Sequence, residues 1–438
     1  MSSYSAPARQ SAAGRIVRSS VAIDRAYDTA LDDWLYLRAR SHAEHPAVGD
    51  VTYAELYERV AALDPERRVV APARPTLEFV GLVHACQRAG SVFVPTDPRE
   101  PRPPDASGVE AGEGDTVLFT SGTSGSPKPV VLRRANFEAS AIASAWNLGV
   151  APDDRWLCVL PLHHVGGLSI LWRSVIYGTT VVLPERFDPA GVIAAVQDGA
   201  VTIASLVPTM LRRLRGAGLS GPGGVRAVLL GGGPVRRDLL EWSAAIGLPV
   251  LQTYGMTETA SQIATLGAAE ALHHHGSAGR PLLGVELAIG AGGEVLVRGP
   301  MVSRRALADD GWLHTGDRGH LDEDGFLHVE GRLDDVIVTG GENVAAAEVE
   351  EALLAHPAVA DVAVAGRPDR EWGQAVTAWV VVATDVPDRE LAAHCRARLA
   401  AFKVPKAFVR VDELPRNAAG KVVRRRLTAG TPTLESAP

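Results

Sequence analysis

The nine residues from Thr120 to Lys128 combine hydroxyl side chains, two glycines and one lysine. They follow an apolar run, Thr116-Val117-Leu118-Phe119, which predicts a short buried strand. Glycine lets the backbone turn and present its N–H groups, the hydroxyls add donors, and the lysine adds a mobile positive charge. Such a loop suits a polyphosphate. It is not a Walker A loop, because Lys128 lies between Pro127 and Pro129, and for this segment alone a flexible connection is the alternative.

Four further motifs with polar and charged residues follow along the chain. They are Gln252-Thr253-Tyr254-Gly255-Met256-Thr257-Glu258-Thr259, then Leu313-His314-Thr315-Gly316-Asp317 with Gly331-Arg332-Leu333-Asp334, then Thr339-Gly340-Gly341-Glu342-Asn343, and finally Leu414-Pro415-Arg416-Asn417 with Gly420-Lys421. Taken alone, each charged residue has a structural explanation. Asp317 could cap a turn, Arg332 could form a surface ion pair, and Glu258 could stabilise a helix N-terminus. Lys421 could lie in a solvated turn.

The five motifs, in this order and at this spacing, resemble the adenylate-forming superfamily of acyl-CoA synthetases, luciferases and peptide-synthetase adenylation domains. The resemblance covers about residue 30 to the C-terminus. It implies that a carboxylate attacks the α-phosphate of ATP, that pyrophosphate leaves, and that a thiol then displaces AMP from the acyl-adenylate. The implied cofactors and cosubstrates are ATP, Mg²⁺ and coenzyme A.

The resemblance also assigns roles to individual residues. Thr257 would bond the α-phosphate, Glu258 would hold Mg²⁺, Tyr254 would lie against the adenine, and Asp317 would accept both ribose hydroxyls beside Arg332. The ATP-binding set is Thr120, Ser121, Gly122, Thr123, Ser124, Gly125, Lys128, Gly232, Tyr254, Gly255, Met256, Thr257, Asp317 and Arg332. The catalytic set is Lys421, Thr257, Glu258 and His164. Lys421 would neutralise charge between the attacking carboxylate and the α-phosphate, since lysine keeps its charge near neutral pH.

Residues 161–178, and residues 231–234 with 252–262, are similar to one branch of this superfamily, the o-succinylbenzoate–CoA ligases of menaquinone biosynthesis. These enzymes activate the aliphatic carboxylate of an aromatic diacid. A buried second carboxylate needs donors, and the predicted donors are His164, Arg173, Thr259, Ser261 and Ser277. Arg173 could equally lie on a helix surface, and His164 could be a satisfied core histidine. The alternatives are another aryl-acid CoA ligase, a carrier-protein loading enzyme, or a catalytically silent acyl-adenylate-binding protein.

The alternation of apolar runs and amphipathic stretches predicts how these motifs are positioned. Strand-like runs such as 180–183 and 227–230 alternate with helix-like stretches such as 189–197 and 208–214, which favours layered α/β structure with mostly parallel strands. From about residue 285 an apolar–polar alternation predicts a hairpin, and hence a β-rich subdomain. The last unit is expected to be α+β, with helices near 347–355 and 388–401 and strands near 361–365, 375–382 and 407–411.

These elements predict a flexible tail over 1–25, a large AMP-binding domain over 26–333, and a small domain over 334–438. By resemblance the small domain is mobile. It closes over the first reaction and then rotates about a hinge at Asp334 to admit CoA, with Gly340 and Gly341 on the CoA side.

Composition limits the classes of partner. The 438 residues carry a formal charge of −7, which argues against a nucleic-acid-binding protein. Three scattered cysteines predict neither a disulfide framework nor a metal site and favour the cytoplasm. No signal peptide or transmembrane segment is expected. The expected partners are small molecules, namely a carboxylic acid, ATP and CoA, and a homodimer is left open.

Overall fold

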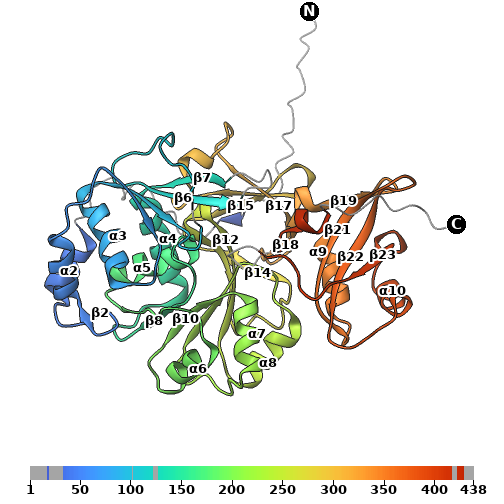
Figure 1. Ribbon diagram of the computed structural model, residues 1–438, viewed down its shortest axis with the longest axis horizontal. Coiled ribbons are helices and arrows are strands. Elements are labelled where there is room, and N and C mark those ends of the chain that lie inside the picture. The colour runs from blue at the N-terminus through green and yellow to red at the C-terminus, as the bar shows by residue number, and fades with distance from the viewer. Residues whose placement is uncertain (1–16, 19–32, 101, 122–126, 417–421, 429–438) are drawn as a thin grey trace, which may run out of the picture.

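The computed structural model describes residues 17–18, 33–100, 102–121, 127–416 and 422–428. Their strands form a four-stranded sheet, a long mixed sheet and a five-stranded sheet (Figure 1). The expected α/β class, with a β-rich part and an α+β C-terminal unit, is confirmed. Within the described residues, no helix is both long and apolar enough to cross a bilayer.

The first sheet supports the predicted phosphate loop. Its order is β4-β5-β6-β7, with the strands β4 Arg68–Pro72, β5 Val92–Thr96, β6 Thr116–Ser121 and β7 Pro127–Leu132. The first three strands run parallel, whereas β7 returns antiparallel to β6 and pairs Thr120 with Lys128. The preceding helices are α1 Trp34–Ser41, α2 Tyr53–Ala61 and α3 Leu77–Ala89. The apolar run before the loop is therefore a buried strand, as expected.

The long sheet begins with short parallel strands separated by helices. The strands are β2 Pro46–Val48, β8 Arg155–Cys158, β9 Thr180–Val182, β10 Ile203–Leu206, β11 Ala227–Leu230 and β12 Val250–Met256, with β3 Val51–Thr52 antiparallel at the edge. The helices are α4 Arg134–Leu148, α5 Val165–Tyr177, α6 Pro189–Gln197, α7 Pro208–Gly216 and α8 Arg237–Ala245. Helices α6 and α7 each begin with a proline. Proline lacks an N–H group, and the first turn of a helix has no intrahelical acceptor for one, so proline is well tolerated there. The predicted α/β alternation is confirmed.

After β12 the same sheet becomes antiparallel. It continues through β13 Ser261–Leu266, β14 Ser277–Pro281, β15 Glu286–Ile289, β16 Glu294–Arg298, β17 Leu313–Leu321 and β18 Leu327–Arg332, with β1 Val17–Arg18 at the end. The predicted hairpin is β15–β16. Three short 3₁₀ turns interrupt this part, at η1 Thr257–Thr259, η2 Ala291–Gly293 and η3 Arg304–Ala306.

The C-terminal unit has its own sheet and core. After the 3₁₀ turn η4 Leu333–Asp335 come β19 Val336–Thr339, β20 Glu342–Ala345, α9 Ala346–Leu354, β21 Val359–Asp369, β22 Gly373–Val382, α10 Asp388–Arg396, η5 Ala401–Lys403, β23 Ala407–Arg410 and α11 Arg424–Thr428. Among described residues, the buried clusters lie wholly before or wholly after η4. This supports the predicted boundary, which stays a prediction. Helix α10 ends earlier than expected because the chain bends after Arg396 and packs Leu399 and Phe402 against the core.

A buried histidine in the N-terminal part makes stability depend on pH. His84 on α3 lines a small cavity of about 10 Å³ with Tyr53 and Leu56, and burial lowers its pKa to about 4. The unfolded histidine has a pKa of about 6.5, so between these values the unfolded state binds the extra proton. Stability is therefore lost as pH falls from about 6.5 to about 4. Between pH 7.5 and pH 5 this group should contribute a loss of about 2 kcal/mol.

Urea unfolding of wild type and His84→Gln at both pH values measures this contribution. The variant should lose about 2 kcal/mol less than wild type over the same interval. An equal pH dependence in both proteins would contradict the neutral, buried state of His84.

Candidate active site

The motif at 252–259 forms the end of strand β12 and a tight 3₁₀ turn. The turn is crowded: a Cβ on Gly255 would lie 1.8 Å from the Ser261 carbonyl oxygen. Ala260 and Ser261 have φ of 49° and 110°, which is uncommon for residues other than glycine. The Thr259 hydroxyl accepts a hydrogen bond from Met256 N at 3.1 Å and lies 2.9 Å from Ser261 O. Thr257 and Glu258 therefore lie on a strained turn, which the hydrogen bonds of the Thr259 hydroxyl stabilise.

Glu258 is half-buried and forms no ion pair with any residue that the structure describes. Across the described chain, no group of three or more His, Cys, Asp or Glu side chains could hold a metal ion. Mg²⁺ keeps several waters and binds one or two carboxylates together with substrate phosphates. A single available carboxylate fits a magnesium ion that arrives with ATP.

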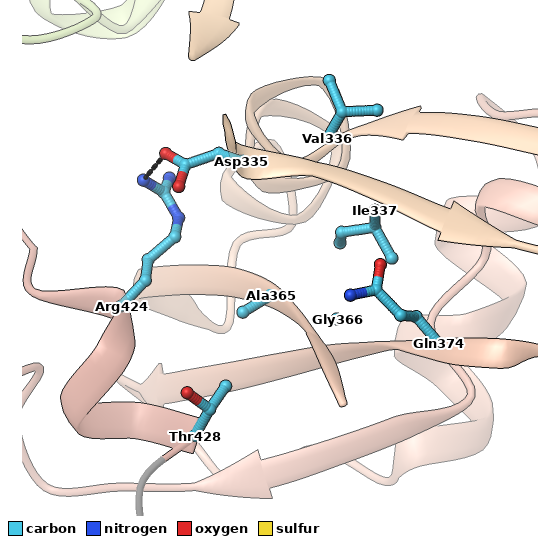
Figure 2. Close-up of a pocket in the computed structure, with 8 residues that line it drawn as sticks. All are labelled: Asp335, Val336, Ile337, Ala365, Gly366, Gln374, Arg424 and Thr428. Atoms are coloured by element: carbon cyan, nitrogen blue, oxygen red, sulfur yellow. Dashed lines mark hydrogen bonds and ion pairs between the residues drawn. The ribbon is translucent and has the colours of Figure 1, made fainter. Parts of the chain in front are cut away.

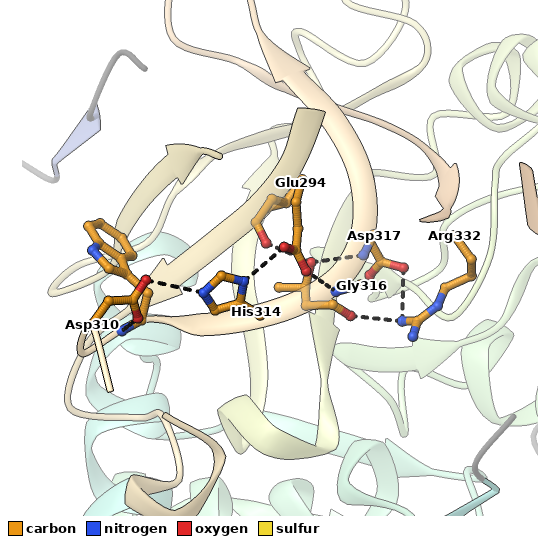
Figure 3. Close-up of polar contacts among 9 residues, drawn as sticks. Glu294, Asp310, His314, Gly316, Asp317 and Arg332 are labelled. Carbon is orange, nitrogen blue, oxygen red and sulfur yellow. Dashed lines mark hydrogen bonds and ion pairs between the residues drawn. The ribbon is translucent and has the colours of Figure 1, made fainter. Parts of the chain in front are cut away.

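Asp317, Tyr254 and Arg332 meet although they are far apart in sequence. Asp317 on β17 is buried, and the strand register places it opposite Arg332 on β18. The Tyr254 hydroxyl donates to Asp317 Oδ2 at 2.6 Å. Arg332 Nη1 donates to Asp317 Oδ1 at 3.0 Å (Figure 3). Burial, and then the Asp317 carboxylate, raise the pKa of Tyr254 well above its usual value, so the phenol stays protonated. Among the described residues each Asp317 oxygen accepts from one of these two side chains, so each keeps a lone pair for a further donor.

Strand β7, which follows the predicted phosphate loop, lies beside the Thr257–Thr259 turn. Ser303, which the sequence analysis did not select, links the two: its hydroxyl donates to Val131 O on β7 at 2.7 Å, and its N–H donates to Glu258 O at 2.7 Å. Thr120 and Lys128 face each other across the β6–β7 hairpin, and the Thr120 hydroxyl lies 3.4 Å from Lys128 O. Ser121 ends β6. Gly122, Thr123, Ser124 and Gly125 lie outside the described residues.

Gly232 and His164 follow the parallel strands β11 and β8, which lie on either side of β10 in the sheet. Gly232 follows β11 with φ of 85°, a left-handed conformation that suits glycine. His164 caps the N-terminus of α5, after β8, and its ring centroid lies 4.2 Å from that of His163. His163 Nε2 in turn lies 3.5 Å from Asp97 Oδ2. Ligand sites of α/β sheets form at such carboxyl ends of strands.

Arg173 is a buried cation and not a surface residue. It lies on α5 with 2% of its surface exposed. Its Nη2 lies 3.4 Å from Ser140 Oγ, and its guanidinium lies 5.6 Å from the centre of the Trp156 ring. Burial lowers its pKa, with Tyr177 acting in the opposite direction. In the described part of the chain Arg173 has no carboxylate partner, and its Nε has no hydrogen-bond partner.

A chain of contacts connects Arg173 to the strained turn. The Ser140 hydroxyl donates to Ala260 O at 2.9 Å while it lies against Arg173. Through Ser140, the guanidinium is therefore linked to the backbone of the segment that carries Glu258 and Ser261. An unpaired buried charge is expensive unless a ligand compensates it.

The hydroxyl groups of two other predicted donors, Thr259 and Ser277, form hydrogen bonds with the protein backbone. The Thr259 hydroxyl closes its own turn, and the Ser277 hydroxyl on β14 donates to Leu327 O at 2.9 Å and accepts from Gly279 N at 2.9 Å. These bonds stabilise the turn and the β14–β18 pairing. Their contact with a ligand stays a prediction.

The small domain places the remaining predicted residues near the boundary. Asp334 lies in η4, and Gly340 and Gly341 form the β19–β20 turn with φ of 58° and 84°. A Cβ on Gly340 would lie 2.9 Å from the Trp372 ring. Lys421 lies outside the described residues. Burial lowers the pKa of Arg212 on α7, while the Asp361 carboxylate of the small domain acts in the opposite direction.

Arg424 ties the chain that follows the predicted hinge to the small domain. It donates to Asp335 Oδ2 at 2.8 Å, to Glu350 Oε1 at 2.7 Å and to Val364 O at 3.0 Å. Figure 2 shows Arg424 and Asp335 at the edge of a cavity of about 180 Å³ that also contains Gln374. None of the predicted ligand-binding residues lines this cavity. Residues from Asp335 onward are therefore fastened to the small domain, which supports a hinge directly before them.

Two family models match the chain. One is described as AMP-binding enzyme and covers residues 103–305, and the other as AMP-binding enzyme C-terminal domain and covers residues 348–421. The first range holds the phosphate loop and the strained turn. The second ends at Lys421.

The chain is also similar to named relatives. It is 47% identical over 337 residues to a 2-succinylbenzoate–CoA ligase of Bacillus licheniformis, covering 73% of this chain and 70% of that protein. A protein of the same name from Bacillus cereus is 45% identical over 335 residues, covering 72% and 70%.

Solved structures show the same fold. The o-succinylbenzoate CoA synthetase MenE from Bacillus subtilis, in complex with the acyl-adenylate intermediate, superposes with a TM-score of 0.83 at 35% identity, covering 92% of this chain and 99% of that one. ATP-bound MatB from Rhodopseudomonas palustris gives a TM-score of 0.79 at 26% identity, covering 90% and 98%.

Proposed function

Because this chain belongs to the AMP-binding, adenylate-forming enzyme family, we propose that it is an ATP-dependent acid–CoA ligase that acts on o-succinylbenzoate. The carrying observation is the meeting of Tyr254, Asp317 and Arg332 beside the Thr257–Glu258 turn, in a chain 45–47% identical to 2-succinylbenzoate–CoA ligases. The product enters menaquinone biosynthesis, as the sequence resemblance implies.

The reaction proceeds in two displacements at one site. A carboxylate oxygen of the acid attacks the α-phosphorus of ATP, the bond to the pyrophosphate oxygen breaks, and an acyl-adenylate forms. The sulfur of CoA then attacks the acyl carbon, the bond to the AMP oxygen breaks, and the thiol proton is released. Two anions must approach in the first step, so fixed donors and cations are the main catalytic requirement.

The proposed site residues supply these groups on separate elements. Asp317 accepts the ribose hydroxyls, and Tyr254 lies beside the base. The Thr257 hydroxyl bonds the α-phosphate, and the Thr120–Lys128 hairpin binds the β- and γ-phosphates. Glu258 would hold Mg²⁺, which neutralises phosphate charge when bound.

The acid is bound by the buried side of the site. His164 lies at the carboxylate that reacts, and Arg173 compensates the second carboxylate of the diacid. A fatty acid would leave Arg173 unpaired, whereas an aromatic diacid supplies the missing anion. Ser261, at the strained position beside Ala260, is a further donor toward the acid.

The small domain would serve the two half-reactions in turn. It delivers Lys421 for adenylation and then rotates about Asp334, so that Gly340 and Gly341 face the pantetheine arm of CoA. A cytoplasmic location and a homodimer are further predictions, which fractionation and light scattering would test.

Pyrophosphate release tests the function. The purified full chain is given ATP, Mg²⁺ and, in turn, o-succinylbenzoate, benzoate, 4-oxo-4-phenylbutanoate, malonate or a fatty acid, each with and without CoA. Release with o-succinylbenzoate and a CoA-dependent thioester are expected. Release with benzoate alone would favour another aryl-acid ligase, and a thioester on a phosphopantetheine carrier but not on CoA would favour a loading enzyme. No release with any acid would leave a silent binding protein.

A further inference from the structure

The carboxylate of Glu294 bonds two groups of the neighbouring strand at once. Glu294 begins β16, and its side chain is 16% exposed. Its Oε1 accepts from Gly316 N at 2.9 Å, and its Oε2 accepts from His314 Nδ1 at 2.8 Å (Figure 3). One side chain therefore holds both ends of the His314–Gly316 stretch of β17.

This stretch leads directly into the Asp317 carboxylate. Gly316 has φ of 67°, a left-handed conformation that favours glycine, and a Cβ there would lie 2.8 Å from Arg332 Nη2. The Thr315 hydroxyl donates to Val295 O at 2.7 Å and accepts from Asp317 N at 3.0 Å. Without Glu294, the Gly316 N–H would lose its acceptor, and a glycine turn has much conformational freedom to regain.

A second carboxylate fixes the imidazole that faces Glu294. His314 Nε2 lies 3.2 Å from Asp310 Oδ2, on the other side of the ring. The hydrogen bonds to Glu294 and then to Asp310 raise the pKa of His314. Glu294 is thereby held between the His314 imidazole and the backbone N–H of Gly316.

We propose that Glu294 is a positioning residue for the nucleotide: it fixes the Thr315–Gly316–Asp317 turn so that the Asp317 carboxylate meets both ribose hydroxyls. This inference rests on the proposed ATP-dependent function. Glu294 would not itself contact the ribose; it acts through its hydrogen bond to the Gly316 N–H. Loss of the turn should weaken nucleotide binding in the ground state and the transition state alike, and so raise the KM for ATP with little change in kcat.

The test compares Glu294→Ala, Glu294→Gln and a matched control, Glu330→Ala. Glutamine keeps an acceptor for the Gly316 N–H. Glu330 on β18 also bonds a histidine, with its Oε1 2.9 Å from His320 Nδ1, and pairs with Arg318 at 3.0 Å, but it does not bond the turn. KM for ATP, KM for the acid, kcat and the Kd of AMP by calorimetry are measured for each full-length protein.

Glu294→Ala should raise the KM for ATP and the Kd of AMP about tenfold, with kcat and the KM for the acid within about threefold. Glu294→Gln should lie within about threefold of wild type, and Glu330→Ala should match wild type. Equal values for Glu294→Ala and wild type, or a fall in kcat alone, would overturn the inference. If the alanine variant does not fold, Glu294→Asp, one methylene too short to reach both partners, must show the raised KM. An inactive wild-type protein would instead overturn the proposed function.

Discussion

Replacing Lys421 with alanine is expected to slow adenylate formation by at least about 10²-fold while leaving acyl transfer from preformed acyl-AMP to CoA largely intact. The reason is the charge that develops when a carboxylate approaches the α-phosphate. An ammonium group placed between the two anions stabilises that transition state. In thioester formation the leaving group is already AMP, so the same cation has little to neutralise. Separate assays of pyrophosphate release and of thioester formation from synthetic acyl-AMP measure the two steps.

Two further lysine variants make the Lys421 result specific. Lys128→Ala, in the phosphate hairpin, should weaken adenylation by only about tenfold, since it removes one supporting charge. Lys403→Ala should leave both steps nearly unchanged, because the Lys403 ammonium already pairs with Glu348 at 2.7 Å. An equal loss in both half-reactions of Lys421→Ala would show that this lysine does not act in adenylation alone, and domain alternation would lose its main support.

Arg173→Met should produce opposite effects on stability and on activity. Arg173 is a fully buried guanidinium without a carboxylate partner among the described residues. Methionine of similar length should keep or raise the free energy of unfolding, by about 1 kcal/mol or more, because an unpaired buried charge is removed. The kcat/KM for o-succinylbenzoate should fall about 10²-fold, because the second carboxylate loses its cation.

A substrate lacking the ring carboxylate isolates this interaction. With 4-oxo-4-phenylbutanoate, wild type and Arg173→Met should have similar kcat/KM. Arg38→Met is the matched control, since Arg38 also bonds α5, donating to the carbonyls of Val175 and Ile176. It should lower stability, by leaving those carbonyls unpaired, and keep the preference for the diacid. If Arg173→Met impairs both acids equally, Arg173 is structural and does not recognise the second carboxylate.

Local sequence patterns determined most of the elements and the order of the motifs. Strand β6 before the phosphate hairpin, helix α6 over Pro189–Gln197 and the β15–β16 hairpin follow from apolar periodicity, turn residues and proline position. These signals depend on only a few neighbouring residues, so they can be recognised without knowledge of the fold. The same patterns could not show where α10 ends, because its last turn gives way to packing of Leu399 and Phe402.

The sequence by itself therefore determined which residue types are available and which elements carry them, together with the family that their order identifies. Only the tertiary structure decided which side chains meet. Strand register brings Asp317 opposite Arg332, and the Tyr254 hydroxyl bonds the same carboxylate. Arg173, a possible surface residue from its sequence, is buried and has no carboxylate partner in the described part of the chain. The Ser277 hydroxyl bonds the backbone. Ser303 and Glu294 carried no local signal at all. The physical reason is that contacts between residues far apart in sequence depend on packing and register, which no short stretch of sequence encodes.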